Sequence, residues 1–333
     1  MTSMRILALA AAASLVFVVG GSAEPMKLRM QYGSATGQFV PIIPLAPKEL
    51  YRHYGKSYTV EPHFMAGSGP ALTALAAGEL DVAGLAPQSM ANAALEGKLE
   101  LRAIAQVLSS DMPGWNATRF WAKGGIKAVA DLKGKTIAVN ARNSSNDAAV
   151  HVVMGRLGLK DGEDYQIAEM RFAAILPALE TDRVAAGVLI QPFSLTAQAK
   201  GYHAVFSTGD AFGPSETVVW GSKADFVAKN RAVLVDMIED HIRLRRWILD
   251  PATRIEAVKL VAQVDKVAVE TLSDWLYTTK DNYHHPLALL DRARFQKNVD
   301  DLVAAKVISG SIDANKYVDI SIAQEAAARL GKN

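Results

Sequence analysis

The chain has 333 residues, of which 36 are Lys or Arg and 34 are Asp or Glu, so its formal net charge is +2. This near balance argues against nucleic-acid binding, which needs a clear excess of basic residues. The chain contains no cysteine, which excludes a disulfide scaffold, a thiolate metal site, a cysteine nucleophile and a lipid attached through cysteine.

The N-terminal residues 1–23 have the pattern of a signal peptide. Arg5 precedes an apolar stretch over 6–19, and small residues follow up to Ala23. The apolar stretch is shorter than the roughly 20 residues that a membrane-spanning helix needs, so cleavage is favoured over a membrane anchor. We therefore expect an exported protein that is soluble after cleavage near Ala23 and begins at Glu24.

Apolar runs with strand character alternate with helical patterns through the first two-thirds of the chain after the signal. Such alternation predicts an α/β fold with largely parallel sheets. From Asp225 onward, strand signals fade and helical periodicity dominates, so we expect the C-terminal third to be mainly helical. The expected strands are 28–32, 58–64, 82–85, 101–108, 136–139 and 186–190, and the expected later helices are 226–249, 254–261, 267–276 and 287–306.

Two segments place small polar residues directly after an expected strand and before an expected helix. The first is Gly-Ser-Gly-Pro at 67–70, where proline suits the first helical turn. The second is Asn-Ser-Ser-Asn-Asp at 143–147, where Ser144 and Asp147 have capping-box spacing. A helix N-terminus presents free N–H groups and the positive end of the helix dipole, so each segment either binds an anion or only caps its helix.

These segments belong to a longer series of motifs. Gly-Ser-Gly-Pro-Ala at 67–71 is followed by Leu-Ala-Ala-Gly-Glu-Leu-Asp-Val-Ala at 75–83 and by Asp-Leu-Lys-Gly-Lys-Thr-Ile-Ala-Val at 131–139. Pro-Ala-Leu at 177–179 and Val-Leu-Ile-Gln-Pro-Phe at 188–193 complete the series. In order and spacing, it resembles the substrate-binding proteins of ABC importers for nitrate, taurine, alkanesulfonates and thiamine-type pyrimidines.

The resemblance implies a two-lobed periplasmic-binding-protein fold of type II, in which each lobe is a mainly parallel sheet flanked by helices, with a helical C-terminal region. The chain would cross between lobes near 118–123 and return near 212–219. Lobe one would comprise 24–120 and 214–333, and lobe two 121–213. The ligand would lie in the cleft between the lobes, and hinge closure would complete its contacts.

Carried across by position, the resemblance also implies a set of cleft residues. Because two helix starts would face the cleft, the expected solute is a small organic anion, a carboxylate or sulfonate, with an apolar or aromatic body. The expected ligand-binding residues are Tyr32, Gly33, Ser34, Ser68, Gly69, Gln88, Trp115, Asn116, Ser144, Ser145, Gln191, Phe193 and Trp220, with Arg142 and Arg171 as candidate partners of the anion.

The chain departs from the family pattern in two places. Pro41, Pro44 and Pro47 interrupt the region of the first helix, which we expect to start late. Ala185 stands where the second lobe often has aspartate, and Gln191 takes a place that is usually acidic. Recognition of an amine at Gln191 is therefore in doubt.

The implied partners are the small anionic ligand and an ABC permease with its ATPase at the inner membrane. The protein is expected to be a monomer in the periplasm and to use no cofactor, metal or nucleic acid. A receptor for an ion-driven importer of the TAXI type is one alternative, because that family also has a glycine-serine turn before a Gly-Glu-Leu-Asp-like run. A thiamine-precursor enzyme of the same fold is another, but it needs a cysteine-rich motif, so a non-enzymatic role is favoured.

Histidine and tryptophan residues of the C-terminal third have simpler interpretations. Tyr-His-His at 283–285, close to Asp281, is interpreted as a loop or cap in preference to a metal site, because adjacent histidines point in different directions. Trp247 and Trp275 fall on apolar helical faces and are expected in the core.

Overall fold

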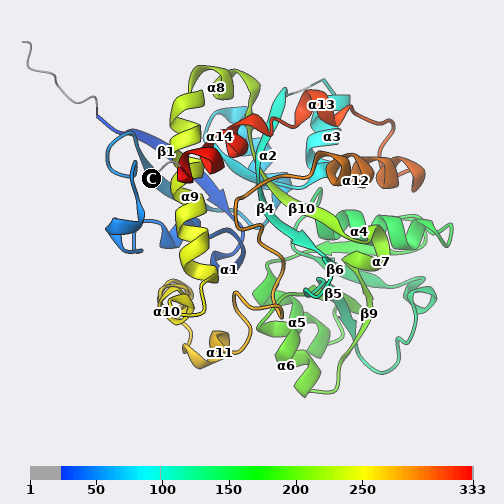
Figure 1. Ribbon diagram of the computed structural model, residues 1–333. Coiled ribbons are helices and arrows are strands. Elements are labelled where there is room, and N and C mark those ends of the chain that lie inside the picture. The colour runs from blue at the N-terminus through cyan, green and yellow to red at the C-terminus, as the bar shows by residue number, and fades with distance from the viewer. Residues whose placement is uncertain (1–23, 98, 332–333) are drawn as a thin grey trace, which may run out of the picture.

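The structure is a computed structural model that describes residues 24–97 and 99–331. The predicted signal peptide at 1–23 lies outside the described residues. The described chain forms two lobes, each built around its own sheet strands, with β1 and β4 in the first and β5 and β6 in the second (Figure 1). In the described part of the chain, each helix is too short or too polar to cross a bilayer.

The first lobe contains strands that precede the second lobe in the sequence and one strand, β10, that follows it. β1 and β2 pair in parallel, while β10 lies between β3 and β4 and runs antiparallel to both. A parallel bridge between Met30 and Val82 links the two groups of strands. The strands are β1 (Met26–Tyr32), β2 (Tyr58–Phe64), β3 (Ala83–Leu85), β4 (Leu101–Ser110) and β10 (Ser215–Lys223).

The second lobe holds one sheet with the strand order β7-β6-β8-β5-β9. β6 runs parallel to both β7 and β8, and β5 runs antiparallel to β8 and β9. The predicted α/β fold with largely parallel sheets is confirmed, with β5 and β10 as the antiparallel strands. The strands are β5 (Arg119–Ala122), β6 (Thr136–Val139), β7 (Gln166–Glu169), β8 (Ala186–Leu189) and β9 (His203–Ser207).

The chain crosses between the lobes earlier than we expected. β4 ends at Ser110 and β5 begins at Arg119, so the first crossing is 111–118, and the predicted crossing at 118–123 falls mostly on a strand of the second lobe. The return runs from the end of α7 at Phe212 to the start of β10 at Ser215. Arg119 therefore belongs to the second lobe's sheet, and not to the first lobe.

Helices cover both sheets, and the C-terminal third is helical as predicted. α14 packs along α9 in the first lobe, and α4 packs against α7 in the second. The helices are α1 (Ala35–Gln38), α2 (Ser68–Ala77), α3 (Pro87–Leu95), α4 (Ser145–Gly155), α5 (Phe172–Glu180), α6 (Phe193–Ala199), α7 (Thr208–Phe212), α8 (Ala224–Lys229), α9 (Arg231–Leu249), α10 (Arg254–Asp265), α11 (Glu270–Ser273), α12 (Arg292–Ala304), α13 (Ala314–Tyr317) and α14 (Ser321–Leu330).

The proline-rich region after β1 folds differently from our expectation. α1 begins at once at Ala35, but it ends after a single turn because Phe39 adopts a left-handed backbone with φ of 59°. Two 3-10 turns follow at Val40–Ile42 and Lys48–Leu50. The prolines therefore shorten the first helix and do not delay it.

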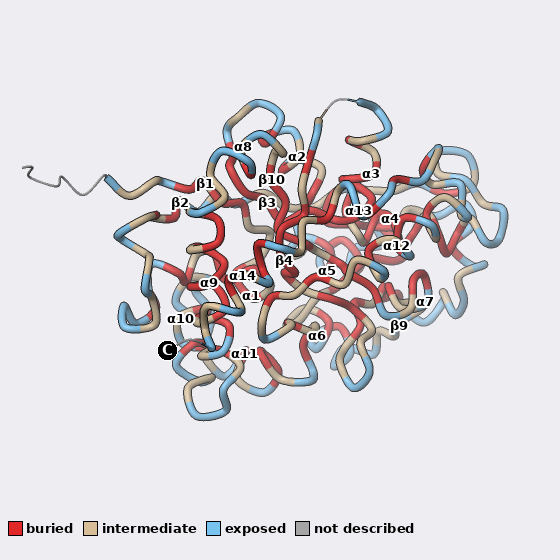
Figure 2. Tube along the Cα trace, turned by 45° about the horizontal axis from the view of Figure 1, so that its top comes forward, coloured by how far each residue is buried: buried red, intermediate tan, exposed pale blue. Residues whose placement is uncertain are grey.

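The strands and inward helix faces form two buried clusters, which Figure 2 shows as red segments under pale loops. Trp220 and Trp275 are both buried in the first-lobe cluster, and Trp247 packs against it. The core positions predicted for Trp247 and Trp275 are thus confirmed.

A buried arginine ties the C-terminal region to the first lobe. Arg245 on α9 donates to the carbonyl oxygens of Gln106, Val107 and His285 at 2.9, 3.1 and 2.8 Å. Burial lowers the Arg245 pKa to about 9. Next to it, Tyr283 pairs with Ser109 at the end of β4 through backbone hydrogen bonds of 2.9 and 3.1 Å. These contacts fix the segment before Tyr283 beside the first crossing.

Candidate ligand-binding cavity

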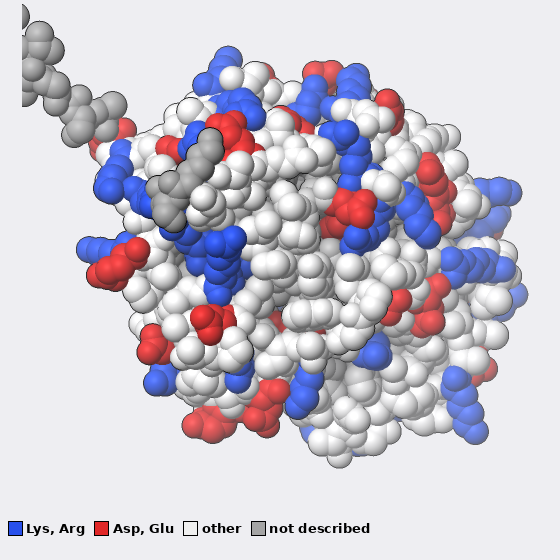
Figure 3. Space-filling model, in the orientation of Figure 1, with Lys and Arg blue, Asp and Glu red and all other residues white. Residues whose placement is uncertain are grey.

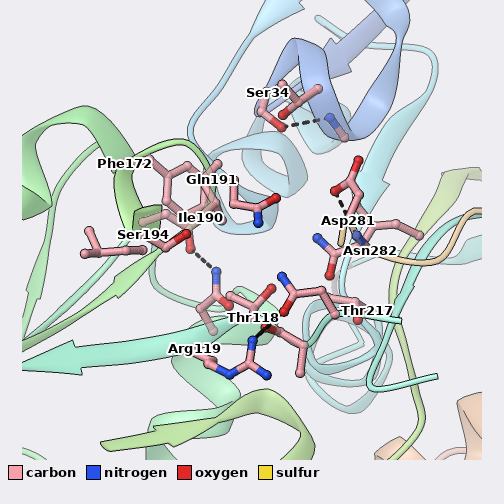
Figure 4. Close-up of a pocket in the computed structure, with 18 of the residues that line it drawn as sticks. Ser34, Thr118, Arg119, Phe172, Ile190, Gln191, Ser194, Thr217, Asp281 and Asn282 are labelled. Carbon is pink, nitrogen blue, oxygen red and sulfur yellow. Dashed lines mark hydrogen bonds between the residues drawn. The ribbon is translucent and has the colours of Figure 1, made fainter. Parts of the chain in front are cut away.

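A cavity of about 610 Å³ lies between the two lobes (Figure 4). Its walls come from the end of β1 and from α1 and α2 in the first lobe, from the 111–118 crossing, and from β5, α4, α5 and α6 in the second lobe. The segment 279–282 closes a further side. In Figure 4, Gln191 and Phe172 lie opposite Asp281 and Asn282, with Ser34 and Arg119 at the other two sides.

The structure brings many of the predicted residues together around this cavity. Strand β1 ends so that Gly33 and Ser34 face it, and the hydroxyl of Ser34 also caps α1 by accepting from Gly37 N at 3.2 Å. The predicted residues that line the cavity are Gly33, Ser34, Ser68, Trp115, Asn116, Ser144, Ser145 and Gln191.

Other predicted residues point away from the cavity. Tyr32 alternates with its cavity-lining neighbours along β1, so its ring turns to the other face of the strand and packs edge-on against Phe64 at 5.6 Å. Trp220 is buried on β10 against His241 of α9, with ring centroids 5.9 Å apart. The predictions for Tyr32 and Trp220 as lining residues are wrong because strand alternation directs both rings elsewhere.

Three further residues that we predicted in the cavity lining lie outside it. Phe193 begins α6 and packs against the second-lobe core, while Ser194 and Gln198, four residues apart, face the cavity. Gln88 is buried beside a separate, smaller cavity. Gly69 lies against the second lobe, where a Cβ atom would sit 2.5 Å from the carbonyl oxygen of Arg142.

Neither of the arginines proposed as anion partners reaches the cavity. Arg142 pairs with Asp161 at 2.5 Å and lies 3.6 Å from Asp147. Arg171 is exposed, and its guanidinium lies 5.1 Å from the ring centre of Phe64. Both cations are thus engaged outside the cavity by local partners that the sequence did not show.

The cavity does contain an arginine that the sequence analysis missed. Arg119 is the first residue of β5, and its guanidinium donates to Asn116 Oδ1 and, at 3.1 Å, to the carbonyl oxygen of Ala117. Both partners are neutral, and within residues 24–97 and 99–331 Arg119 has no carboxylate partner. The only signal in the sequence is a basic residue ahead of the apolar run Phe-Trp-Ala at 120–122, which is common at strand starts.

The first helix start contributes free donors to the cavity. Gly67 precedes α2 without a side-chain cap, and α2 has no acidic residue in its first turn. The first N–H groups of a helix have no partner in the helix itself, so that of Ser68, which lines the cavity, is not used by α2. The Ser68 hydroxyl accepts from Ala86 N at 2.9 Å, which holds the start of α2 against the end of β3.

At the second helix start, the start of α4, most polar groups are already paired with one another. Ser144 caps α4 by accepting from Asp147 N at 3.3 Å, and its own proton goes to Ala141 O at 2.8 Å. The buried carboxylate of Asp147 accepts from Asn143 N at 2.9 Å. Ser144 is thus a helix cap, whereas Ser145 lines the cavity and its hydroxyl has no hydrogen-bond partner among the described residues.

The 279–282 segment brings charge to the opposite wall. Lys280 and Asp281 both line the cavity, and they do not pair with one another in the described part of the chain. Burial raises the Asp281 pKa to about 7, against the lowering effect of backbone hydrogen bonds from Tyr277 and Asn282. No sequence pattern predicts this wall, because its position depends on contacts with residues near 109–116.

Apolar side chains make up much of the remaining lining. Trp115 stands edge-on to Tyr283, with ring centroids 5.3 Å apart, and Trp121, Phe172 and Trp275 also line the cavity. The cavity thus combines an apolar lining with a few charged groups.

On the surface face shown in Figure 3, acidic and basic side chains are interspersed, and mainly uncharged residues cover the middle.

The two lobes are joined by hydrogen bonds beside the cavity. Asn140 Nδ2 of the second lobe donates to Ala66 O of the first at 2.7 Å, and Asn92 Nδ2 donates to Asn143 Oδ1 at 3.1 Å. At Gly67, a Cβ atom would lie 2.8 Å from Asn140 Nδ2. Glycines at this contact therefore allow the lobes to approach.

A metal site finds no support at the histidines. His284 is buried and its Nδ1 lies 2.9 Å from Val107 O, while His285 Nδ1 accepts from Leu287 N at 3.1 Å. Across residues 24–97 and 99–331, no group of three or more histidine and acidic side chains is placed to hold a metal ion.

Comparison with known proteins identifies the family. The profile of the NMT1-like family matches residues 21–262. The chain belongs to the NMT1-like family. It is also 27% identical to candidate binding proteins of Brucella abortus and Brucella suis. The aligned 209 residues cover 60% of this chain and 60% of each relative. The chain thus matches about 60% of the length of these curated relatives.

Solved structures show that this NMT1-like protein has the α/β fold of periplasmic binding proteins. The alkanesulfonate-binding protein SsuA from Xanthomonas axonopodis pv. citri, bound to MOPS, superposes with a TM-score of 0.69 at 17% identity, covering 89% of this chain and 99% of that one. The periplasmic nitrate-binding protein NrtA from Synechocystis PCC 6803 gives a TM-score of 0.71 at 14% identity, covering 93% and 90%. The fold predicted from the motifs is confirmed.

Proposed function

We propose that the protein is a periplasmic solute-binding protein that captures a small organic anion between its lobes and delivers it to an ABC importer. The observation that carries the proposal is Arg119, a guanidinium in the interlobe cavity whose hydrogen-bond partners are neutral. A cation in a cavity shielded from water is stabilised when an opposite charge joins it. A carboxylate or sulfonate matches its paired donors.

The helix starts strengthen the case for an anion. The free N–H groups at the start of α2 and at Ser145 of α4 lie on the cavity wall, and each helix dipole favours an anion by about 0.3–1 kcal/mol. Ser34 and Ser145 add hydroxyl donors. The anion would therefore meet donors from both lobes.

The apolar lining supports an organic body on the ligand. Of the aromatic residues that we expected from the sequence, Trp115 lines the cavity. Trp121, Phe172 and Trp275 take the place of the others. Rings of this kind bury large areas and pack against other rings. A volume of about 610 Å³ also exceeds what a bare inorganic anion fills.

Binding without chemistry fits the lining. The described residues around the cavity include no histidine, and Asp281 is their single carboxylate. A general base next to a nucleophile, which acyl transfer and related reactions need, is thus missing from the described wall.

The fold and its relatives support delivery to an importer. Structural neighbours are named as periplasmic sulfonate- and nitrate-binding proteins and as a ligand-binding component of an ABC-type import system. We infer an inner-membrane permease with its ATPase as the partner, and a ligand-driven shift from an open to a closed form.

A thermal-shift panel tests the proposed function. Aliphatic and aromatic carboxylates and sulfonates are compared with the neutral amide of each, and a ligand at a hundred times its dissociation constant should stabilise the protein by about 2.7 kcal/mol. We expect stabilisation by acids and not by amides, together with a smaller radius of gyration in small-angle scattering. Stabilisation by amides alone, or an unchanged scattering profile at saturation, would contradict the proposal.

A further inference from the structure

The wall opposite Gln191 carries hydrogen-bond acceptors that lack a donor. The Asp281 carboxyl is buried with 7% of the residue exposed, and it lines the cavity. Within the described residues, no Lys, Arg or His side chain lies within ion-pair distance of it. A buried carboxylate without a cation is unstable relative to water unless donors surround it.

Backbone groups satisfy only part of this carboxyl. Oδ1 accepts from Asn282 N at 2.8 Å and Oδ2 accepts from Tyr277 N at 3.1 Å. An ionised carboxyl offers about four acceptor positions, so about half of them are left for another donor. The neighbouring Asn282 Oδ1 is also buried, lines the cavity and has no hydrogen-bond partner.

The acceptors lie close to the cationic end of the cavity but separate from it. Asn116 N donates to Asp281 O at 3.2 Å, while the side-chain oxygen of Asn116 accepts from Arg119. Asn116 thus links Arg119 to the main-chain carbonyl of Asp281, and the guanidinium and the carboxyl form no ion pair with each other. One small molecule with opposite polar ends could contact both.

We propose that Asp281, with Asn282 beside it, selects ligands that carry a hydrogen-bond donor, an ammonium or hydroxyl group, in addition to the acid held at Arg119. This inference rests on the proposed function, because it assumes an anionic group in the same cavity. A ligand without the donor leaves the desolvated Asp281 carboxyl unpaired, which costs free energy. A site that hydrogen-bonds a polar group of its ligand therefore discriminates strongly against analogues without that group.

Two ligand series test the inference by calorimetry. The first is valerate, 4-hydroxybutyrate and 4-aminobutyrate, and the second is 3-(4-ethylphenyl)propionate with its 4-hydroxymethyl and 4-aminomethyl analogues. In each series the acid is constant, and only the far group changes from methyl to hydroxyl to ammonium. We expect a donor-bearing member of at least one series to bind at least ten-fold more tightly than the methyl member.

Matched variants assign the effect to Asp281. Asp281→Asn should reduce the ratio between donor and methyl members at least five-fold, whereas Asp274→Asn, which removes an exposed charge on the same segment outside the cavity, should preserve it. Equal affinities across both series, or an unchanged ratio in Asp281→Asn, would overturn the inference while leaving anion binding intact. Failure of every acid to bind would overturn the inference and the proposed function together.

A pH series on the unaltered protein tests the role of Asp281 even if the Asp281→Asn variant does not fold. The groups that contact the carboxyl are the backbone N–H groups of Tyr277 and Asn282. The cations Lys280 and Arg119 line the same cavity without pairing with it. Because burial raises the Asp281 pKa to about 7, the carboxyl gains charge across this range and the ammonium-to-methyl affinity ratio should rise several-fold from pH 6 to pH 8. Glu216, whose pKa burial also raises to about 7, is outside the lining and should affect both ligands equally.

The pH series also separates the two donors. A ratio that rises with pH for the ammonium member assigns the donor as an ammonium. A ten-fold preference for the hydroxyl member that persists across the range assigns a hydroxyl, because either protonation state of the carboxyl can accept from it. A flat ratio near one for both members would overturn the inference without any variant.

Discussion

The two helix starts at the cavity have similar sequences but different free groups. α2 begins at Ser68 without a side-chain cap or an acidic residue in its first turn. α4 begins at Ser145 after a capping serine, and the buried Asp147 occupies its first turn. The positive end of α2 is therefore uncompensated, whereas a carboxylate already offsets part of the α4 dipole. The α2 start in the first lobe should therefore stabilise a bound anion more strongly than the α4 start, although the two sequences are similar.

The same comparison separates side chains that hold the fold from those that are free for a ligand. The Ser68 hydroxyl accepts from Ala86 N, while the Ser145 hydroxyl has no partner in the described part of the chain. A serine at a helix start can therefore be a structural anchor or a ligand donor. The four predictions below test this difference, from the largest expected effect to the smallest.

Gly69→Ala should weaken ligand binding by as much as the loss of a hydrogen bond to a charged ligand. Its Cβ would sit 2.5 Å from Arg142 O, a backbone atom of the opposite lobe, so closure would be blocked at the α2 start. Overpacking of this kind costs about 1–3 kcal/mol, which corresponds to roughly 5- to 150-fold in affinity. Calorimetry with the best acid from the panel measures it.

The matched control is Gly124→Ala, where a Cβ meets nothing within 4 Å. Because an open form relieves the clash, unfolding of the ligand-free Gly69→Ala protein should match the unaltered protein. Equal ligand affinity in both variants would show that the closed contact at Gly69 is not needed for binding.

Ser145→Ala should reduce affinity for the acid without changing the ligand-free stability. The hydroxyl has no structural partner, so its loss removes only a hydrogen bond to the charged ligand, which contributes about 1.5–3 kcal/mol. Calorimetry and chemical denaturation measure the two quantities. An unchanged affinity would show that Ser145 does not contact the anion.

Ser68→Ala should lower the ligand-free stability and leave the affinity for the acid unchanged. Without the hydroxyl, the buried N–H of Ala86 loses its acceptor, and an unsatisfied buried donor costs about 1–3 kcal/mol. The free energy of unfolding in urea without ligand should fall by that amount. A variant as stable as the unaltered protein, yet with weaker ligand binding, would make Ser68 a ligand donor and remove the contrast with Ser145.

Asp147→Asn should have the smallest effect on binding and the opposite sign. Removing the carboxylate leaves the α4 dipole less compensated, so acid binding should tighten by about 0.3–1 kcal/mol. Stability should decrease because Arg142 and His151 lie 3.6 and 3.5 Å from this carboxylate. Weaker acid binding in a folded variant would contradict the unequal helix starts.

Local patterns were sufficient for much of the fold. The runs at 28–32, 58–64 and 136–139 combine β-branched or aromatic residues with clear helix starts after them, and all three form strands. The missed strand β7 is as long as the predicted strand β6, but it lies at the edge of its sheet and none of its residues is buried. It therefore lacks the apolar run that marks the other strands, and it depends on pairing with its neighbour.

The cavity could be predicted only in part, for a related reason. Ser34, Asn116 and Gln191 follow strands or crossings that motifs locate, so their positions were accessible. Arg119 and Asp281 were not, because Asn116 N meets Asp281 O across a long stretch of sequence. The cations chosen from the sequence, Arg142 and Arg171, were near the right elements but satisfy local partners.

The central claim is that Arg119 holds an anionic group between the lobes. Calorimetric titration of one acid and its neutral amide against the unaltered protein and Arg119→Gln tests it most directly, with Arg183→Gln as a control that removes an exposed second-lobe charge outside the cavity. We predict that the acid binds the unaltered and control proteins at least ten-fold more tightly than the amide, and that Arg119→Gln largely abolishes this preference. An equal acid preference in Arg119→Gln would contradict the account.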